Sequence, residues 1–132
     1  MGLSVGEDKS NTLIQRTPDG YNHLEAAIAK IAVEIPEAKE YATALEVDVL
    51  NTEGATKTGD RAAVSRALTK FAKDLRAGAH TVGSNPELYH LADNIAPAEL
   101  RQLAGKIVTG EEGSLKAVDN LMEQFAQLVV HA

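Results

Sequence analysis

The sequence contains no cysteine, no tryptophan and no long apolar run. Without cysteine the chain cannot form a disulfide, a thiolate zinc site, an iron–sulfur cluster or a cysteine nucleophile. A membrane-spanning helix needs about 20 consecutive apolar residues, and the apolar runs here extend over only a few positions. These absences predict a cytoplasmic protein that does not enter the membrane.

Positive charge is also scarce, with 13 basic against 19 acidic residues and a formal net charge of −6. Nucleic-acid binding would need a local basic face to overcome that balance. The best candidate is a helical stripe of Arg66, Lys70 and Lys73, but Asp60 and Asp74 are interleaved with it. Two Phe and three Tyr also leave little on which bases can stack. We interpret the stripe as a solvated helix face and expect no nucleic-acid partner.

Apolar residues recur every three or four positions in separate segments, which is the spacing of one helix face. The clearest stripes are Leu24, Ile28, Ile31 and Ile35; Ala38, Tyr41, Leu45 and Val49; Val64, Leu68, Phe71 and Leu75; and Leu115, Val118, Met122, Phe125 and Val129. Few aromatic residues and many alanines favour slim helices that approach each other closely. The pattern predicts an all-α protein, an antiparallel bundle of four main helices.

Prolines, glycines and capping residues predict the helix boundaries. Thr17 and Pro18 suit the start of the first helix. The stretch 51–59, NTEGATKTG, contains two glycines and no apolar rhythm, so we expect a mobile loop there. Pro97 interrupts the segment 86–109, which therefore reads as a kinked helix in two pieces.

The domain organisation follows from these boundaries. Residues 1–16 are polar and predict a flexible N-terminal segment, with a short strand within residues 3–16 left open. Residues 17–132 form a single helical-bundle domain, a size that needs no metal or disulfide for stability.

Glu87 and His90 stand three residues apart, so one helix face can present both to a metal ion. Asp93 adds a further oxygen ligand at the same spacing. The pair occurs once, so a complete site requires His23 or His80 from another helix, or a second chain. The alternative is that Glu87 favours the helix dipole at a first turn and His90 is an exposed side chain.

Motifs for catalysis and for phosphate binding are missing. The chain has neither a Gly-x-Ser-x-Gly elbow nor a glycine-rich loop followed by Lys-Ser or Lys-Thr. We therefore name no catalytic residue and expect no cofactor. A helix-turn-helix over residues 88–108 would offer Arg101, Gln102 and Lys106 to DNA, but the turn lacks the usual glycine.

The last predicted helix, residues 114–130, is apolar over about half of its circumference. A single helix–helix seam does not use so wide a face, and Leu121, Phe125 and Leu128 are candidates for contact with a partner. We therefore expect a non-catalytic interaction module that binds another protein or a second copy of itself. The alternatives are a small-ligand- or metal-binding bundle and a helix-turn-helix protein. Burial of the same face at the centre of the bundle is the competing interpretation.

Overall fold

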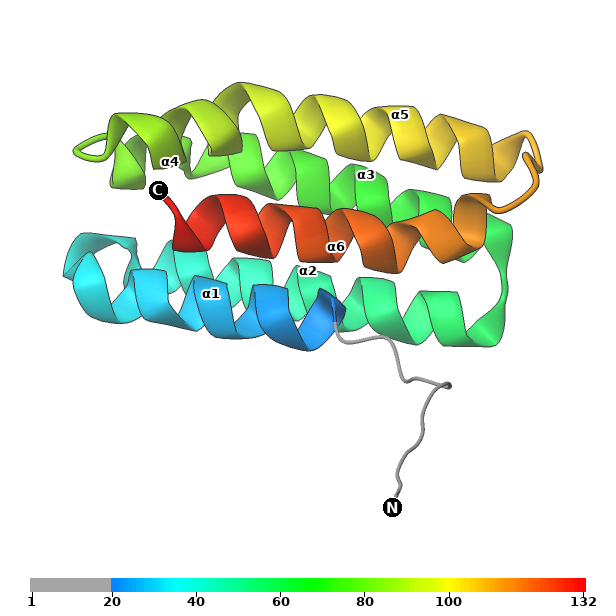
Figure 1. Ribbon diagram of the computed structural model, residues 1–132, viewed down its shortest axis with the longest axis horizontal. Coiled ribbons are helices and arrows are strands. Elements are labelled where there is room, and N and C mark those ends of the chain that lie inside the picture. Colours follow the sequence, from blue (N-terminus) through cyan, green and yellow to red (C-terminus); the bar gives the residue numbers. More distant parts are fainter. Residues whose placement is uncertain (1–19) are drawn as a thin grey trace, which may run out of the picture.

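The computed structural model describes residues 20–132, and helices make up all of its regular secondary structure (Figure 1). In chain order the segments are α1 (Gly20–Glu34), η1 (Pro36–Ala38), α2 (Lys39–Thr58), α3 (Arg61–Ala77), η2 (Ala79–Val82), α4 (Pro86–His90), η3 (Leu91–Ile95), α5 (Ala96–Val108) and α6 (Ser114–Val130). The all-α prediction is confirmed. The expected flexible segment 1–16, the strand within 3–16 and the helix start at Thr17 lie outside the described residues.

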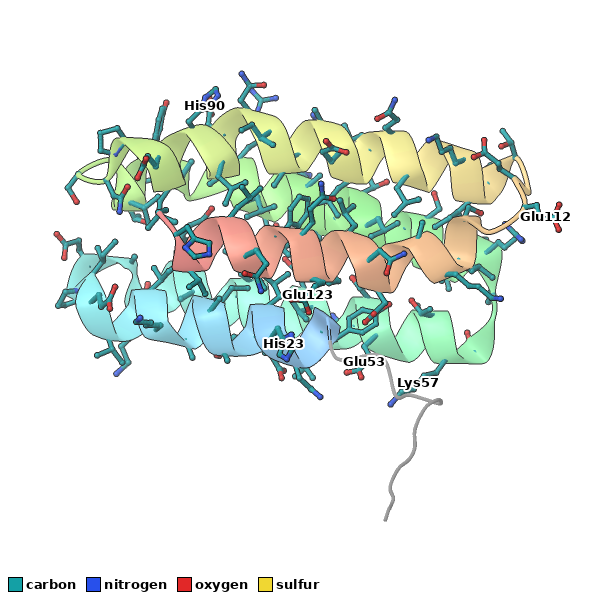
Figure 2. All side chains as sticks on the ribbon, in the orientation of Figure 1. His23, Glu53, Lys57, His90, Glu112 and Glu123 are labelled. Atoms are coloured by element: carbon teal, nitrogen blue, oxygen red, sulfur yellow. The ribbon has the colours of Figure 1, made fainter. Side chains whose placement is uncertain are left out.

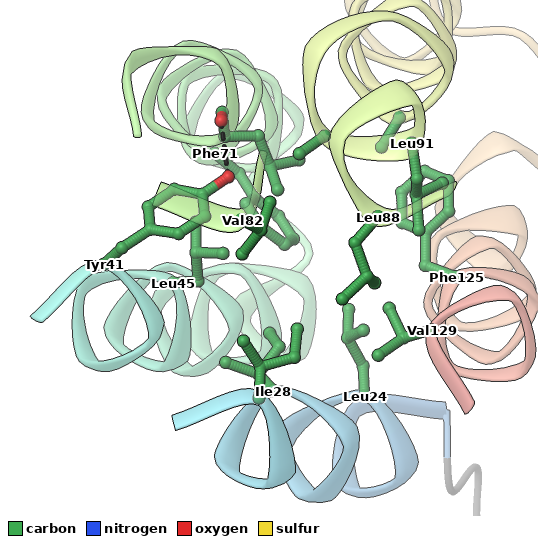
Figure 3. A pocket seen from close by; sticks show the side chains of 14 residues that line it. Leu24, Ile28, Tyr41, Leu45, Phe71, Val82, Leu88, Leu91, Phe125 and Val129 are labelled. Carbon is green, nitrogen blue, oxygen red and sulfur yellow. Dashed lines mark hydrogen bonds between the residues drawn. The ribbon is translucent and has the colours of Figure 1, made fainter. Parts of the chain in front are cut away.

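The long helices form a ring around one core (Figures 1 and 3). Helix α1 packs against α2, α2 against α3, and α3 against the continuous rod made by α4, η3 and α5. Helix α6 closes the ring, with extensive contact to α1 and much less to α5. Apolar positions of all these helices meet in the centre, as the stripes predict.

The loop predicted at 51–59 is wrong, because α2 continues to Thr58. Thr52 is completely buried, and its hydroxyl donates to the Asp48 carbonyl at 2.8 Å. Thr56 donates to the Thr52 carbonyl and accepts a hydrogen bond from the Tyr21 hydroxyl at 2.9 Å. Threonine can bond the carbonyl one turn back, so these residues continue the inward face of α2 with polar groups satisfied inside the helix.

The helix ends agree better with the sequence. Asp60 caps α3 by accepting a hydrogen bond from the Ala63 N–H, and Asn85 caps α4 by accepting from the N–H groups of Glu87 and Leu88. Gly59, with φ of 73°, ends α2 in the left-handed conformation that glycine adopts without strain.

The segment predicted as a kinked helix in two pieces, residues 86–109, consists of α4 and α5 joined by the π-helical turn η3. Proline has no N–H, and its ring collides with the carbonyl four residues back, here that of Asp93. The chain accommodates this by widening one turn into a π-helix, Leu91–Ile95, in which the Ala96 N–H bonds the Leu91 carbonyl five residues back. The helix therefore runs through the proline without interruption.

Among residues 20–132, the helices are too short or too polar to cross a membrane. This finding agrees with the expectation drawn from the apolar runs.

Candidate functional site

An apolar cavity lies inside the ring, toward the end where α1 and α6 finish (Figure 3). Its volume is about 40 Å³. All of its lining residues are apolar or aromatic: Leu24, Ile28, Ile31, Tyr41, Leu45, Phe71, Leu75, Val82, Leu88, Leu91, Ala92, Ala96, Phe125 and Val129. Each long rod contributes to the wall, so the cavity belongs to the bundle as a whole.

The one hydroxyl in the cavity wall is already used. The Tyr41 hydroxyl donates to the Leu75 carbonyl, which is the dashed line in Figure 3. Burial raises the pKa of Tyr41, and the nearby Asp74 raises it further, so this group stays neutral in the physiological range. Ala92 of the π-helical turn and Ala96, the first residue of α5, also line the cavity with small side chains. The site is therefore a place for hydrocarbon, with no group poised for acid–base chemistry.

A groove at the surface lies directly outside this cavity, between α1, α4 and α6, with a volume of about 330 Å³. Ile31, Leu88 and Val129 line both the groove and the cavity. These three side chains therefore form a wall that separates the interior from the groove. The rim is polar and includes Ser84 and Asn85.

Two charged residues of α1 also stand at this rim. Lys30 and Glu34 pair across one helical turn at 3.8 Å, and both side chains are more than half exposed. An exposed pair of this kind holds its partners weakly, so both charges remain available to a polar group in the groove.

Helix α6 is fixed to α1 and is less tightly packed against α5. The Gly20 N–H donates to Asp119 at 2.9 Å, and His23 pairs with Glu123 (Figure 2). On the other side, a second groove of about 230 Å³ separates α6 from α5. The ring is consequently less tightly packed where α6 meets the α4–α5 rod.

The candidate metal ligands do not converge within the described part of the chain. Glu87 and His90 are exposed on α4, and Asp93 is half-buried on η3. His23 lies on α1 and is paired with Glu123, away from His90 (Figure 2), and His80 is exposed. Residues 20–132 contain no group of three or more His, Asp or Glu side chains able to hold a metal ion.

The candidate partner-binding residues divide between core and surface. Leu121 is 7% exposed and Phe125 3%, and Phe125 lines the cavity. Leu128 is 44% exposed. Only Leu128 of the three is open to a partner, because the wide apolar face of α6 packs against both of its neighbours. Arg101, Gln102 and Lys106 are exposed on α5, and the last two line the groove against α6.

A buried acid between α2 and α3 was not anticipated from the sequence. Asp48 is 2% exposed, and its Oδ2 is the one buried side-chain oxygen or nitrogen in residues 20–132 that has no hydrogen-bond partner. Lys70 Nζ lies 3.7 Å from Asp48 Oδ1 and 2.7 Å from Asp74 Oδ2. Asp48 lies beside Leu45 and Val49 on the apolar stripe of α2. An acidic residue on this otherwise apolar helix face is the feature of the sequence that could have indicated a buried acid.

The environment separates the pKa values of the two acids. Burial, followed by the neighbouring Asp74, raises the pKa of Asp48 to about 7. The hydrogen bond with Asp48, together with Lys70, lowers the pKa of Asp74. The pair therefore favours one shared proton, carried by Asp48.

Comparison of the chain with protein-family models, with curated proteins and with solved structures found no match.

Proposed function

We propose that the protein is a non-catalytic binding protein that takes a small apolar or amphipathic ligand at the end of the bundle where α1 and α6 finish. The observation that carries this proposal is the apolar cavity and the neighbouring groove, which share Ile31, Leu88 and Val129 as lining residues. A cavity lined by hydrocarbon stays dry, and binding of an apolar group in it is favourable because the lining atoms gain van der Waals contacts.

The volumes define the kind of ligand. The cavity alone, at about 40 Å³, admits only a very small apolar group. Pockets for small molecules usually measure about 300–1,000 Å³, and the groove adds about 330 Å³. Rotation of the Leu88 and Val129 side chains would join the two spaces. A ligand with a hydrocarbon end in the cavity and a polar end near Lys30, Ser84 and Asn85 suits this shape.

A protein partner is the second candidate, as the sequence suggested. It is supported by Leu128 and Val130, which are 44% and 55% exposed on α6. A second copy of the chain is the simplest partner for such a face. Sedimentation velocity of the wild type against Leu128→Glu tests it: a dimer that the substitution abolishes supports self-association, and a monomeric wild type contradicts it.

The ligand proposal is tested by nuclear magnetic resonance of labelled Ile, Leu and Val methyl groups. The protein is titrated with xenon as the apolar probe and with 1-octanol as the amphipathic probe. We expect saturable shifts concentrated on Leu45, Leu88 and Val129 with both probes. Methyl groups at the far end of the bundle, such as those of Val64 and Val118, serve as the internal control.

Ala96→Leu supplies the blocked variant, because it adds three carbon atoms to a side chain in the cavity wall. Ala98→Leu makes the same change at an exposed position of the same helix. We expect Ala96→Leu to abolish the saturable shifts and Ala98→Leu to leave them unchanged. Absence of saturable shifts in the wild type, or their persistence in Ala96→Leu, would overturn the proposal.

A further inference from the structure

The buried acid Asp48 on α2 faces two charged side chains of α3, Lys70 and Asp74. Lys70 Nζ lies 3.7 Å from Asp48 Oδ1 and 2.7 Å from Asp74 Oδ2, so the two carboxyl groups lie next to each other around one ammonium group. The positive charge of Lys73, also on α3, lowers the pKa of Asp74. On the other side of α2, helix α1 contributes the apolar Leu24 and Ile28 to the shared core.

Two carboxylate groups cannot hydrogen-bond to each other without a proton. The unpartnered Oδ2 of Asp48 marks the place where a donor is missing from the described contacts. A proton on the Asp48 carboxyl group supplies that donor and lets Asp48 bond Asp74. Loss of the proton leaves two negative charges at the seam with Lys70 between them, and Asp48 then remains a buried anion with an unsatisfied oxygen.

We propose that Asp48 and Asp74 form a proton-operated latch, which holds α2 against α3 when they share a proton and loosens the seam when they lose it. The latch lies close to the cavity in the fold. Leu45 stands three residues before Asp48, and Phe71 stands three residues before Asp74, and both line the cavity. The same seam therefore sets the position of one cavity wall.

The direction of the pH effect follows from the burial of Asp48. Its pKa is raised from 3.8 in the unfolded chain to about 7 in the folded one. An acid whose pKa is higher in the folded than in the unfolded state stabilises the fold at low pH. That contribution to the free energy of unfolding is lost as the pH rises toward 7. Asp74, whose pKa is lowered, acts oppositely and only below about pH 4. Between pH 5 and 8 the latch therefore weakens as the solution becomes more alkaline.

The test compares the wild type with Asp48→Asn, whose amide donates a hydrogen bond to Asp74 at every pH. Glu40→Gln is the matched control, because it makes the same chemical change at an exposed position of α2. Amide hydrogen exchange in α2 and α3 is measured from pH 5 to 8, after correction for the intrinsic pH dependence. We expect the opening constant of these helices to rise about tenfold or more in the wild type and in Glu40→Gln, and to stay flat in Asp48→Asn.

Two further measurements test the proposal if Asp48→Asn folds poorly. The carboxyl carbon of Asp48 should titrate with a midpoint near 7. In Lys70→Gln the midpoint should move to higher pH, because Lys70 lowers the pKa of Asp48, and the rise of the opening constant should continue to higher pH than in the wild type. A midpoint below 5, or parallel profiles for the wild type and Asp48→Asn, would overturn the latch. All these experiments use the protein without ligand, so they do not depend on the proposed binding function.

Discussion

Gly78 sits where α3 ends, against the ring of Tyr41, and its replacement by alanine tests how the end of the bundle is packed. A Cβ atom at position 78 would lie 2.1 Å from Cδ1 and 2.5 Å from Cε1 of Tyr41. The backbone of Gly78, with φ of −107° and ψ of 9°, is open to other residues. The penalty of Gly78→Ala therefore arises from the collision with Tyr41.

The magnitude can be worked from these contacts. Overpacking costs about 1–3 kcal/mol, and displacement of the ring also breaks the bond from Tyr41 to the Leu75 carbonyl, worth about 1 kcal/mol. Replacing a glycine also lowers the conformational entropy of the unfolded chain, which stabilises the folded state by about 0.4–1 kcal/mol. The net destabilisation is about 1–3.5 kcal/mol, and a value in the middle of that range lowers the Tm by roughly 10 °C for a domain of this size.

Urea denaturation of four proteins provides the assay: wild type, Gly78→Ala, Tyr41→Ala and the double variant. Once the ring is absent, the three atoms nearest to the new Cβ are gone. The glycine-entropy gain occurs in both backgrounds and cancels, so the coupling energy should be about 2–4 kcal/mol. Gly54→Ala is the control, because its Cβ meets nothing within 4 Å in the middle of α2, and it should gain about 0.5–1 kcal/mol. Equal losses from Gly78→Ala in both backgrounds would refute the reasoning.

Two other substitutions probe the packing of α1 against α6 and the boundary between groove and cavity. In Gly20→Ala the new Cβ would lie 2.2 Å from the backbone carbonyl oxygen of Asp119, which cannot rotate away. We therefore expect the free energy of unfolding, measured by urea denaturation, to fall by about 1–3 kcal/mol. Amide exchange in α1 and α6 should be faster. Unchanged stability would contradict the close approach of these helices. Leu88→Ala removes part of the wall between groove and cavity, so it should cost about 2–3 kcal/mol and speed the exchange of 1-octanol seen in methyl line shapes. Slower or unaltered exchange would mean that Leu88 does not control access.

The helical architecture was predictable because apolar side chains mark the buried faces directly. The stripe ending at Leu75 and the caps at Asp60 and Asn85 depend on residues close in sequence, and the structure agrees with them. The stretch 51–59 was wrongly predicted to be a loop because its inward-facing positions carry threonine and alanine instead of large apolar residues. Thr52 is nevertheless completely buried, since its hydroxyl is satisfied by the carbonyl of the preceding turn.

The candidate site was less accessible to sequence reasoning for a physical reason. The cavity is the space that several helices leave between them, and no single segment encodes it. Leu121 and Phe125 made the apolar face of α6 wider than contact with one helix requires, which suggested a partner. Helix α6 instead contacts two neighbouring helices, and both residues are buried in the core. Asp48 was not anticipated either, although an acidic residue on the apolar stripe of α2 was a signal that the sequence offered.

The widened turn before Pro97 also determines which side of the rod faces inward. Ala92, Ala96, Leu100 and Ala104 are all buried, although they follow each other at intervals of four. In a regular α-helix each such interval advances by about 40°, so three of them would carry the row about 120° around the axis. The extra residue held in the wide turn offsets much of that drift. Deleting one residue there would restore regular pitch and swing the Leu100 side of the rod out of the core by about 100°.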